Sequence, residues 1–421
     1  MDRKAFFKSG HFPTLISALL YFDVSFMVWV LLGPLAPFIS EQLKLTPAQK
    51  GLLTAVPLLG GSLFRPVMAA LGDRIGGRRA GLIGMTVSLV PLILGWGFTS
   101  QLWQFYVAGF LLGIAGASFG VALPLASRWY PPEQQGLVMG IAGSGNSGTL
   151  LATLFAPRLA ERFGYHAAFA FAALPVLAVM LIFALFARDN PARKPAPSSA
   201  EYAGVLREGD TYWMCLFYSL TFGGFVGLTS YLTLFFSDQY HLSHVRAGDF
   251  TTIVVVAGSF LRPVGGWVSD KMGGYRFLLL LLGAAAAGFA SISALPSLAT
   301  ATVLLFLAMG TLGMGNGAVF QLVPLRFSSQ VGLVTGIVGA AGGLGGFLIP
   351  FGLGYLRGET GHYSAGFAAY AAIFLGACLA LLALGRSWLK TWPTEQAEYA
   401  AIFALGMPLA SRTGAAPAEA D

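Results

Sequence analysis

The segment Ser62-Leu63-Phe64-Arg65-Pro66-Val67 returns 197 positions later as Ser259-Phe260-Leu261-Arg262-Pro263-Val264. The loop after each copy repeats at the same spacing, because Asp73 recurs as Asp270. A repeat that keeps both its apolar and its charged positions indicates an internal duplication. We therefore predict two related halves, each with one arginine in an apolar segment.

Both arginines are predicted to lie deep in a membrane. Arg65 precedes Asp73 by eight residues, which corresponds to about 12 Å along an α-helix. This distance approaches the centre of a hydrocarbon layer about 30 Å thick. A cation at such a depth is costly unless it faces a partner, a cavity or a ligand, so it is a functional candidate. Arg65 and Arg262 together predict one anion site shared by the two halves.

The composition of the chain supports a membrane location. Of its 421 residues, 56% are hydrophobic and 10% are charged, and the mean hydropathy is +0.71. These values lie far outside the range of soluble globular domains. The formal charge of +7 is spread singly over short loops, which argues against a nucleic-acid partner. The first apolar run exceeds 20 residues and has no cleavage site, so we expect a first transmembrane helix and no cleaved signal.

Apolar segments predict an all-α membrane protein with twelve transmembrane helices in two pseudo-symmetric six-helix halves. The longest polar interruption, 188–210, is rich in Pro and Ser and has the composition of a linker. We therefore expect an N-terminal half at 1–190, a cytoplasmic linker at 191–210, a C-terminal half at 211–390 and a cytoplasmic tail at 391–421. The twelve expected spans are 13–38, 48–71, 80–98, 101–124, 136–160, 166–187, 211–237, 247–269, 277–294, 298–322, 332–355 and 363–389.

Loop charge predicts the orientation of these helices. Most of the 25 Lys and Arg residues fall on the side that holds both termini and the linker. By the positive-inside rule that side is cytoplasmic, in a multi-pass protein of the cytoplasmic (inner) membrane. The other side carries Lys44, Lys50, Arg158, Arg162, Arg246 and Arg357.

Two six-helix halves joined by a linker resemble the major facilitator superfamily over nearly the whole chain. The loop Gly72-Asp73-Arg74-Ile75-Gly76-Gly77-Arg78-Arg79 looks like the signature between helices 2 and 3 of that superfamily, and 269–276 is a weaker copy. An acid followed by a glycine turn and basic residues can lock neighbouring helix ends in one conformation. We assign this gating role to Asp73, Arg74, Arg79 and Asp270. Simple anchoring by positive charge is the alternative, but it requires neither the Asp nor the repeat.

Two glycine-rich segments, 140–148 and 336–346, occupy the predicted helices 5 and 11. Small residues let helix backbones approach closely, which suits helices that slide or pivot and equally suits static packing. Asn146 differs from its neighbours, because an amide in hydrocarbon must find a hydrogen-bond partner on another helix or on a substrate. The glycines assigned to gating or helix packing are Gly143, Gly145, Gly148, Gly339, Gly342 and Gly343.

Together, these glycine segments and the two arginines resemble the nitrate/nitrite porter family. The resemblance implies a substrate site with Arg65, Arg262 and Asn146 as anion ligands. It also implies aromatic walls at Tyr218, Phe222 and Phe119, although Phe119 and Phe222 taken singly are more typical of packing residues. Gly342 takes the place of Asn146 in the repeat, so we expect an asymmetric site.

The chemistry of such a site suits a planar anion. A guanidinium group is a planar fork of donors that can bind two oxygens of nitrate or nitrite at once. Aromatic rings above and below a flat ion would exclude tetrahedral sulfate or phosphate by shape, and Tyr218 would add a hydroxyl donor. The expected substrates are therefore nitrate and nitrite, moved by alternating access.

Asp23 lies well inside the first apolar segment and raises the question of coupling. One interpretation makes it a proton acceptor for nitrate/proton symport; the other has it paired with an arginine or hydrogen-bonded to neighbouring helices. Two fixed positive charges should resist reorientation while the site is empty, which favours nitrate/nitrite antiport. The residues leave both mechanisms open.

No enzyme site, metal site or cofactor is predicted. The histidines lie in or beside loops without a metal cage, and no P-loop appears, so we expect no cofactor, no metal and no catalytic residue. Membrane lipid and a small anion are the expected partners of a monomer. A facilitator for another small anion and a non-transporting nitrate sensor are the alternative functions.

Overall fold

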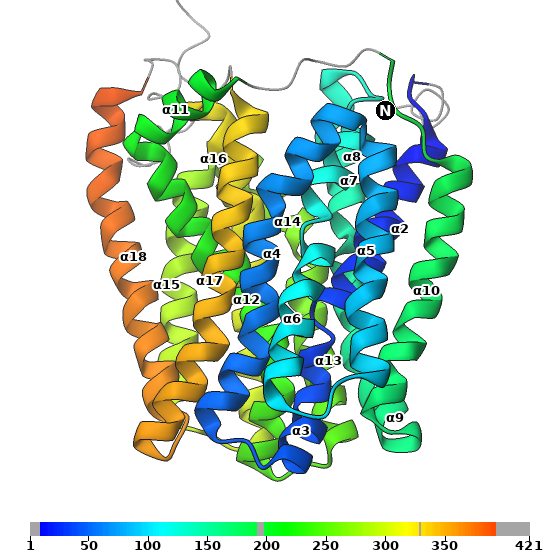
Figure 1. The fold of residues 1–421 in the computed structure, drawn as a ribbon. Helices are drawn as coiled ribbons and strands as arrows, with labels where there is room; N and C mark the ends of the chain where they lie inside the picture. The colour runs from blue at the N-terminus through cyan, green and yellow to red at the C-terminus, as the bar shows by residue number, and fades with distance from the viewer. Residues whose placement is uncertain (1–8, 192–197, 328–329, 393–421) are drawn as a thin grey trace, which may run out of the picture.

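The computed structural model describes residues 9–191, 198–327 and 330–392. Every regular element within these ranges is helical, which confirms the predicted fold class. The long helices stand side by side in one bundle (Figure 1). The beginning of α2 (Phe12–Trp29) and the end of α18 (Ser364–Thr391) lie at the same end of this bundle, together with α11 (Ser199–Arg207). We call this the linker end.

The helices of each half are named as in Figure 1. The N-terminal half contains α2 (Phe12–Trp29), α3 (Leu32–Leu43), α4 (Pro47–Ile75), α5 (Gly77–Gly97), α6 (Leu102–Gly116), α7 (Phe119–Ser127), α8 (Pro132–Gly143), the 3₁₀ turn η1 (Ser144–Ser147), α9 (Gly148–Phe163) and α10 (Tyr165–Phe186). The C-terminal half contains α12 (Gly209–Tyr240), α13 (His244–Phe260), α14 (Arg262–Met272), α15 (Gly274–Ser293), α16 (Leu298–Arg326), α17 (Val331–Thr360) and α18 (Ser364–Thr391). The short helix α11 (Ser199–Arg207) lies between them.

Eleven helical segments in the described residues are long and apolar enough to cross a membrane. The expected span 136–160 is missing from this set, because η1 divides it into the shorter helices α8 and α9. Three glycines lower the helix propensity here, and the hydroxyls of Ser144 and Thr149 bond locally to the carbonyls of Ile141 and Asn146. The fifth span in chain order is therefore a broken helix. Counted as one crossing, α8, η1 and α9 bring the eleven long segments to a total of twelve.

The two charged loops turn in the same way. Gly76 follows α4 with φ 100°, and Gly273, its counterpart in the repeat, follows α14 with φ 85°. Both values lie in the region that favours glycine, because a Cβ would be strained there. The duplicated loops thus have the duplicated backbone conformation that their sequences predict.

The segment predicted as a linker is partly helical, since α11 forms inside it. Ser198 caps the helix: its hydroxyl accepts from the Glu201 N–H at 3.3 Å, and the Glu201 carboxylate accepts from the Ser198 N–H at 2.7 Å. These hydrogen bonds lower the pKa of the Glu201 carboxyl below its usual value. Residues 192–197 and 393–421, which cover other parts of the predicted linker and tail, lie outside the described residues.

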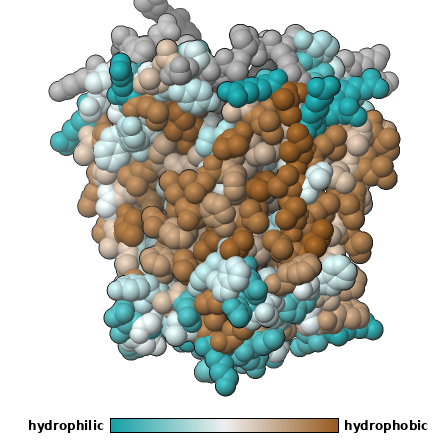
Figure 2. All heavy atoms as spheres, viewed as in Figure 1, coloured by the Kyte–Doolittle hydropathy of each residue, from teal (hydrophilic) through white to brown (hydrophobic). Residues whose placement is uncertain are grey.

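The surface identifies a multi-pass membrane protein. Figure 2 shows a band of hydrophobic residues around the middle of the molecule, with hydrophilic residues at both ends. Large apolar side chains are exposed on the spanning helices, among them Leu181 of α10 and Leu348 of α17. Such a belt is favourable against lipid, because exposing so much apolar surface to water is costly.

The halves meet along the centre of the bundle, where α4 packs on α17 and α9 packs on α13. Ser62 of α4 donates to the Ala340 carbonyl of α17 at 2.6 Å, and Thr252 of α13 donates to Thr153 of α9 at 2.8 Å. The residues of the candidate site project into this interface.

Candidate substrate-binding site

Arg65 is held in the middle of α4 and is 3% exposed. Its Nε donates to the Gly116 carbonyl of the same half at 3.1 Å, and its Nη1 donates to the Gly339 carbonyl of the other half. Its Nη2 is buried and has no protein partner. The guanidinium is therefore oriented by both halves and keeps the two N–H donors of Nη2 for a ligand.

Arg262, its counterpart in the repeat, is differently supported. The span predicted as 247–269 breaks at Leu261, so Arg262 is the first residue of α14. Pro263 follows it and cannot donate the backbone bond that would continue α13. Arg262 is half-buried, and its buried Nη1 has no protein partner. It is thus the more exposed of the two cations.

Both arginines lie close to the ring of Phe119, so the structure brings the two halves of the repeat together here. The Phe119 centroid lies 5.5 Å from Cζ of Arg65 and 5.9 Å from Cζ of Arg262. Between the described residues, no carboxylate lies within ion-pairing distance of either guanidinium. Two like charges in a buried place repel each other, so an anion bound between them would relieve the repulsion.

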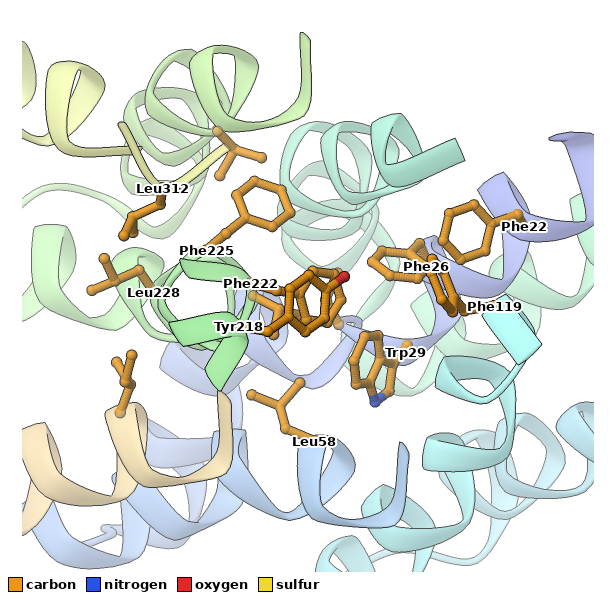
Figure 3. Packing of buried hydrophobic residues seen from close by; sticks show 14 of the residues in the cluster. Phe22, Phe26, Trp29, Leu58, Phe119, Tyr218, Phe222, Phe225, Leu228 and Leu312 are labelled. Atoms are coloured by element: carbon orange, nitrogen blue, oxygen red, sulfur yellow. The ribbon is translucent and has the colours of Figure 1, made fainter. Parts of the chain in front are cut away.

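Aromatic rings from both halves surround these cations. Phe222 lies 4.9 Å from Cζ of Arg65, and its ring is stacked on that of Tyr218 with centroids 5.1 Å apart and planes 1° apart. Figure 3 shows Tyr218 and Phe222 of α12 overlapping at the centre, with Trp29 and Phe119 of the other half nearby. The Tyr218 hydroxyl is buried without a protein partner, so it is a further donor for a ligand.

Asn146 is fully buried in η1, at the break of the fifth span. Neither its Oδ1 nor its Nδ2 has a protein partner. Burial of an amide without hydrogen bonds costs about 1–3 kcal/mol, which a bound oxyanion would offset. The predicted ligands Arg65, Arg262 and Asn146, together with Tyr218, therefore supply buried N–H and O–H donors that the protein itself leaves unused.

The glycine segments bring backbones against this site. A Cβ on Gly342 would lie 2.7 Å from the Tyr218 ring and 2.8 Å from the Phe222 ring, and one on Gly145 would lie 2.7 Å from the Phe22 ring. A Cβ on Gly339 would lie 3.5 Å from the Phe119 ring and 4.0 Å from Nη1 of Arg65. These contacts show close packing.

Gly143, Gly148 and Gly343 complete the predicted set of glycines. A Cβ on Gly143 would lie 4.0 Å from Cζ of Arg262, one on Gly148 would overlap the Asp23 backbone, and one on Gly343 would lie 2.8 Å from Cβ of Ser62 in the other half. Whether the glycine segments also move stays a prediction.

Asp23 of α2 accepts a hydrogen bond from the Ser147 hydroxyl of η1 at 2.6 Å. This contact corresponds to the predicted bond with a neighbouring helix, and it ties the carboxylate to the residue next to Asn146. Among the residues that the structure describes, no cluster of His, Cys, Asp and Glu could hold a metal ion.

The charged loops lie away from the site, at the linker end. Asp73 pairs with Arg128 at the end of α7, at 2.6 Å between Oδ1 and Nη2. Its counterpart Asp270 is exposed. Arg74 and Arg79 are exposed and line a cleft with Arg78, Arg188 and Asp189.

Two aromatic residues of the site were missed by sequence reasoning. Trp29 lies 5.1 Å from Cζ of Arg65, and its indole N–H donates to the Pro57 carbonyl at 2.7 Å. Phe320 of α16 lies 6.0 Å from Cζ of Arg262 and 4.6 Å from the Tyr218 ring. No motif marks them, because an aromatic residue in an apolar helix is ordinarily a packing residue.

Comparison with known proteins gives a consistent set of relatives. The family model described as Major Facilitator Superfamily matches residues 18–350. The chain is 33% identical to the nitrite extrusion protein of Bacillus subtilis over 351 residues, which cover 83% of this chain and 88% of that protein. It is 34% identical to the probable nitrate/nitrite transporter NarK2 of Mycobacterium tuberculosis over 378 residues, or 88% and 95% of the two chains. Identity to the probable nitrate transporter NarT of Staphylococcus carnosus is 33% over 371 residues, or 86% and 92%.

Proposed function

This chain belongs to the Major Facilitator Superfamily, and on that premise we propose that it is a secondary transporter of nitrate, nitrite or both. The names of its relatives support this substrate class. The observation that carries the proposal is the meeting of Arg65 and Arg262 at one ring, each with a buried donor that lacks a protein partner.

The proposed ligands fit a small planar oxyanion. Nη2 of Arg65, Nη1 of Arg262, the Asn146 amide and the Tyr218 hydroxyl are donors, while the stacked rings of Tyr218 and Phe222 form a flat wall. A planar ion can lie against such a wall and still receive hydrogen bonds at its edges. A tetrahedral ion would place an oxygen against the ring face, so the site should reject it.

The proposed transport cycle is a rocking of the two halves about this central site. We place the linker end, with both termini, on the cytoplasmic side of the inner membrane and propose a monomer without cofactor or catalytic activity. Asp73 with Arg128, and Arg74, Arg79 and Asp270, are proposed to gate the linker end, while the glycine segments form the moving contacts.

We propose nitrate/nitrite exchange as the coupling mechanism. Arg65 and Arg262 lack a carboxylate partner between the described residues, so the empty site would carry uncompensated charge during reorientation. Nitrate/proton symport is the second candidate, favoured by the position of Asp23 beside η1. In that case Asp23 would take up the proton.

Uptake of nitrate into proteoliposomes tests both parts of the proposal. We expect uptake that requires nitrite inside, does not depend on an inward proton gradient and is lost in Arg65→Lys, because lysine keeps the charge but not the planar fork. Uptake into empty vesicles that is driven by protons and lost in Asp23→Asn would instead establish symport. Uptake of sulfate or dicarboxylates in place of nitrate would contradict the substrate, and nitrate binding without transport would indicate a sensor.

A further inference from the structure

A second buried amide lies in the core of the C-terminal half. Asn316 of α16 is fully buried, and neither its Oδ1 nor its Nδ2 has a protein partner. Its carboxamide therefore has the same unsatisfied hydrogen-bonding capacity as that of Asn146. Burying an amide without hydrogen-bond partners lowers the stability of the folded state, and a leucine of similar size would avoid that loss. Packing alone therefore does not explain an asparagine at this position.

The neighbours of Asn316 show which way it points. A Cβ on Gly315 would lie 2.6 Å from Thr221 of α12, and one on Gly317 would lie 3.0 Å from the Arg262 carbonyl oxygen of α14. Successive helical residues are about 100° apart, so the side chain between these two glycines points into the gap between α12 and α14. Phe320, one turn later on the same face, reaches Tyr218 and Arg262 in this gap.

In the internal repeat, Asn316 is the counterpart of a residue of the candidate site. Three glycines recur 197 positions later: Gly113, Gly116 and Gly120 correspond to Gly310, Gly313 and Gly317. At the same spacing, Phe119 corresponds to Asn316. A Cβ on Gly120 would lie 3.4 Å from the Arg65 carbonyl oxygen, and one on its counterpart Gly317 would lie 3.0 Å from the Arg262 carbonyl oxygen, so the two segments are equivalent in structure as well as in sequence. Asn316 thus stands in the C-terminal half where Phe119 stands in the N-terminal half.

We propose that Asn316 is a further anion-binding residue, whose Nδ2 donates to an oxygen of the substrate. This inference rests on the proposed function and adds to it. In the repeat, Gly342 of α17 stands where the N-terminal half has Asn146, so α17 provides no amide. Asn316 of α16 provides it instead, and each half then contributes one arginine and one asparagine. A substrate bound by both pairs would draw the halves together around it, and Asn316 would contribute to the selection of oxyanions over halides, which lack a second acceptor atom.

Asn316→Leu tests the proposal in the purified full-length protein. Dissociation constants of nitrate and nitrite would be measured by calorimetry, and the melting temperature would be measured without anion. We expect both dissociation constants to rise about tenfold or more, as for loss of one hydrogen bond to a charged group, while the melting temperature stays equal or rises. Asn146→Leu should behave alike. Asn316→Asp, which places a carboxylate beside the anion, should abolish binding.

A matched control on the same helix is Gln321→Leu, because the Gln321 side chain accepts from the Gly274 N–H at 3.0 Å and has a structural role. It should lower the melting temperature and leave both dissociation constants unchanged. If Asn316→Leu behaves like this control, or if Asn316→Asp retains nitrate affinity, the inference is wrong.

Wild-type measurements separate this inference from the proposed function. Binding of formate or bicarbonate but not of nitrate or nitrite would contradict the substrate, and weakening of that binding by Asn316→Leu would still support an anion-binding role. A wild type that binds none of these anions would overturn both.

Discussion

The two ends of the bundle hold the halves together in different ways. At the end opposite the linker, Asp238 of α12 accepts from Lys50 of α4 at 3.0 Å and pairs with Arg357 of α17. The Tyr363 hydroxyl also donates to Asp238, at 3.3 Å. Burial raises the pKa of Tyr363 well above its usual value, so this hydroxyl stays a donor at every physiological pH. One carboxylate therefore joins both halves.

Two further pairs cross between the halves at this end. Arg158 of α9 pairs with Asp249 of α13 at 2.7 Å, and His244 of α13 lies 3.6 Å from Glu41 of α3. At the linker end, the ion pairs between described residues each stay within one half. Asp73 binds Arg128 there, while Arg326 binds Glu208 and Asp210.

Glycine contacts between the halves also differ between the two ends of the bundle. At the end opposite the linker, a Cβ on Gly51 would lie 2.5 Å from the Pro350 carbonyl oxygen, and one on Gly33 would lie 2.5 Å from the Ser230 carbonyl oxygen. Gly140 and Gly336, toward the linker end, would meet nothing within 4 Å. The described contacts between the halves are thus closer opposite the linker than at the linker end. In the proposed rocking cycle, this structure corresponds to a state that is closed at the end opposite the linker.

Asp238→Asn should disturb this arrangement most. It leaves Lys50 and Arg357, with side chains only 18% and 21% exposed, without their carboxylate. We expect the closed end to open, so that a cysteine placed at buried Ser230 reacts at least about tenfold faster with an impermeant maleimide. The measurement requires Cys215 and Cys378 to be replaced by serine, because both thiols are free.

Asp249→Asn is the matched control for that change. Its pair with Arg158 is 37% and 42% exposed, and solvent weakens such pairs to about 0–1 kcal/mol. Labelling should change by less than about threefold. Equal labelling rates in the two variants would contradict the closing role of Asp238.

Gly51→Ala and Gly140→Ala test the glycine contrast. The first places a methyl group against the α17 backbone and should lower the melting temperature and raise Ser230→Cys labelling several-fold. The second meets open space and replaces a poor helix former, so it should leave labelling unchanged and raise stability by up to about 1 kcal/mol. A similar loss in both variants would remove the distinction between the ends.

Asp73→Asn should have a smaller effect, confined to the linker end. Its pair with Arg128 is partly exposed and joins helices of one half. We expect nitrate uptake to slow a few-fold, because helix ends are held less firmly, while Ser230→Cys labelling stays as in the parent. Faster labelling would show that the two ends are coupled more tightly than their contacts indicate.

The smallest expected effect is the pH response of His11, near the linker end. Its Nδ1 accepts from the Thr14 N–H at 3.2 Å, and Thr14 in turn accepts from the Arg188 N–H at 2.9 Å. Burial and then the Arg188 charge lower the pKa of His11 below its usual value. Stability from the neutral ring is therefore present above about pH 6.5 and is lost as the pH falls through the folded pKa.

Melting temperatures at pH 8 and pH 5.5 measure this response. The wild type should lose about 1 °C more than His11→Asn, which keeps a capping oxygen but does not titrate in this range. An equal loss in both proteins would assign the pH response to other groups.

Sequence patterns predicted most of the fold and part of the site. Twelve spans, two halves and the repeated arginines follow from hydropathy and from the 197-residue spacing. The break at Leu261 does not follow, because equivalent sequences behave differently: Pro66 lies inside continuous α4, whereas Pro263 is the second residue of the new helix α14. The helix propensity of the two Arg-Pro segments is similar, so packing against distant segments determines whether the helix continues.

The partners of polar side chains were the least predictable part. Arg65 donates to a carbonyl of the other half at Gly339, a contact that no spacing encodes. Asn316 had a readable signal, since it stands between two glycines and opposite Phe119 in the repeat. Its missing partners become evident only when the surrounding helices are placed.

The broken fifth span also bears on how the chain is mapped experimentally. In the described part of the chain, eleven helical segments are long and apolar enough to cross a bilayer, and an odd number of crossings places the two ends of a chain on opposite sides. The two short helices around η1 restore an even number, and the beginning of α2 and the end of α18 lie at the same end of the bundle (Figure 1). A reporter enzyme fused after α18 should therefore report the same compartment as one fused before α2, and one fused after α10 should agree with both.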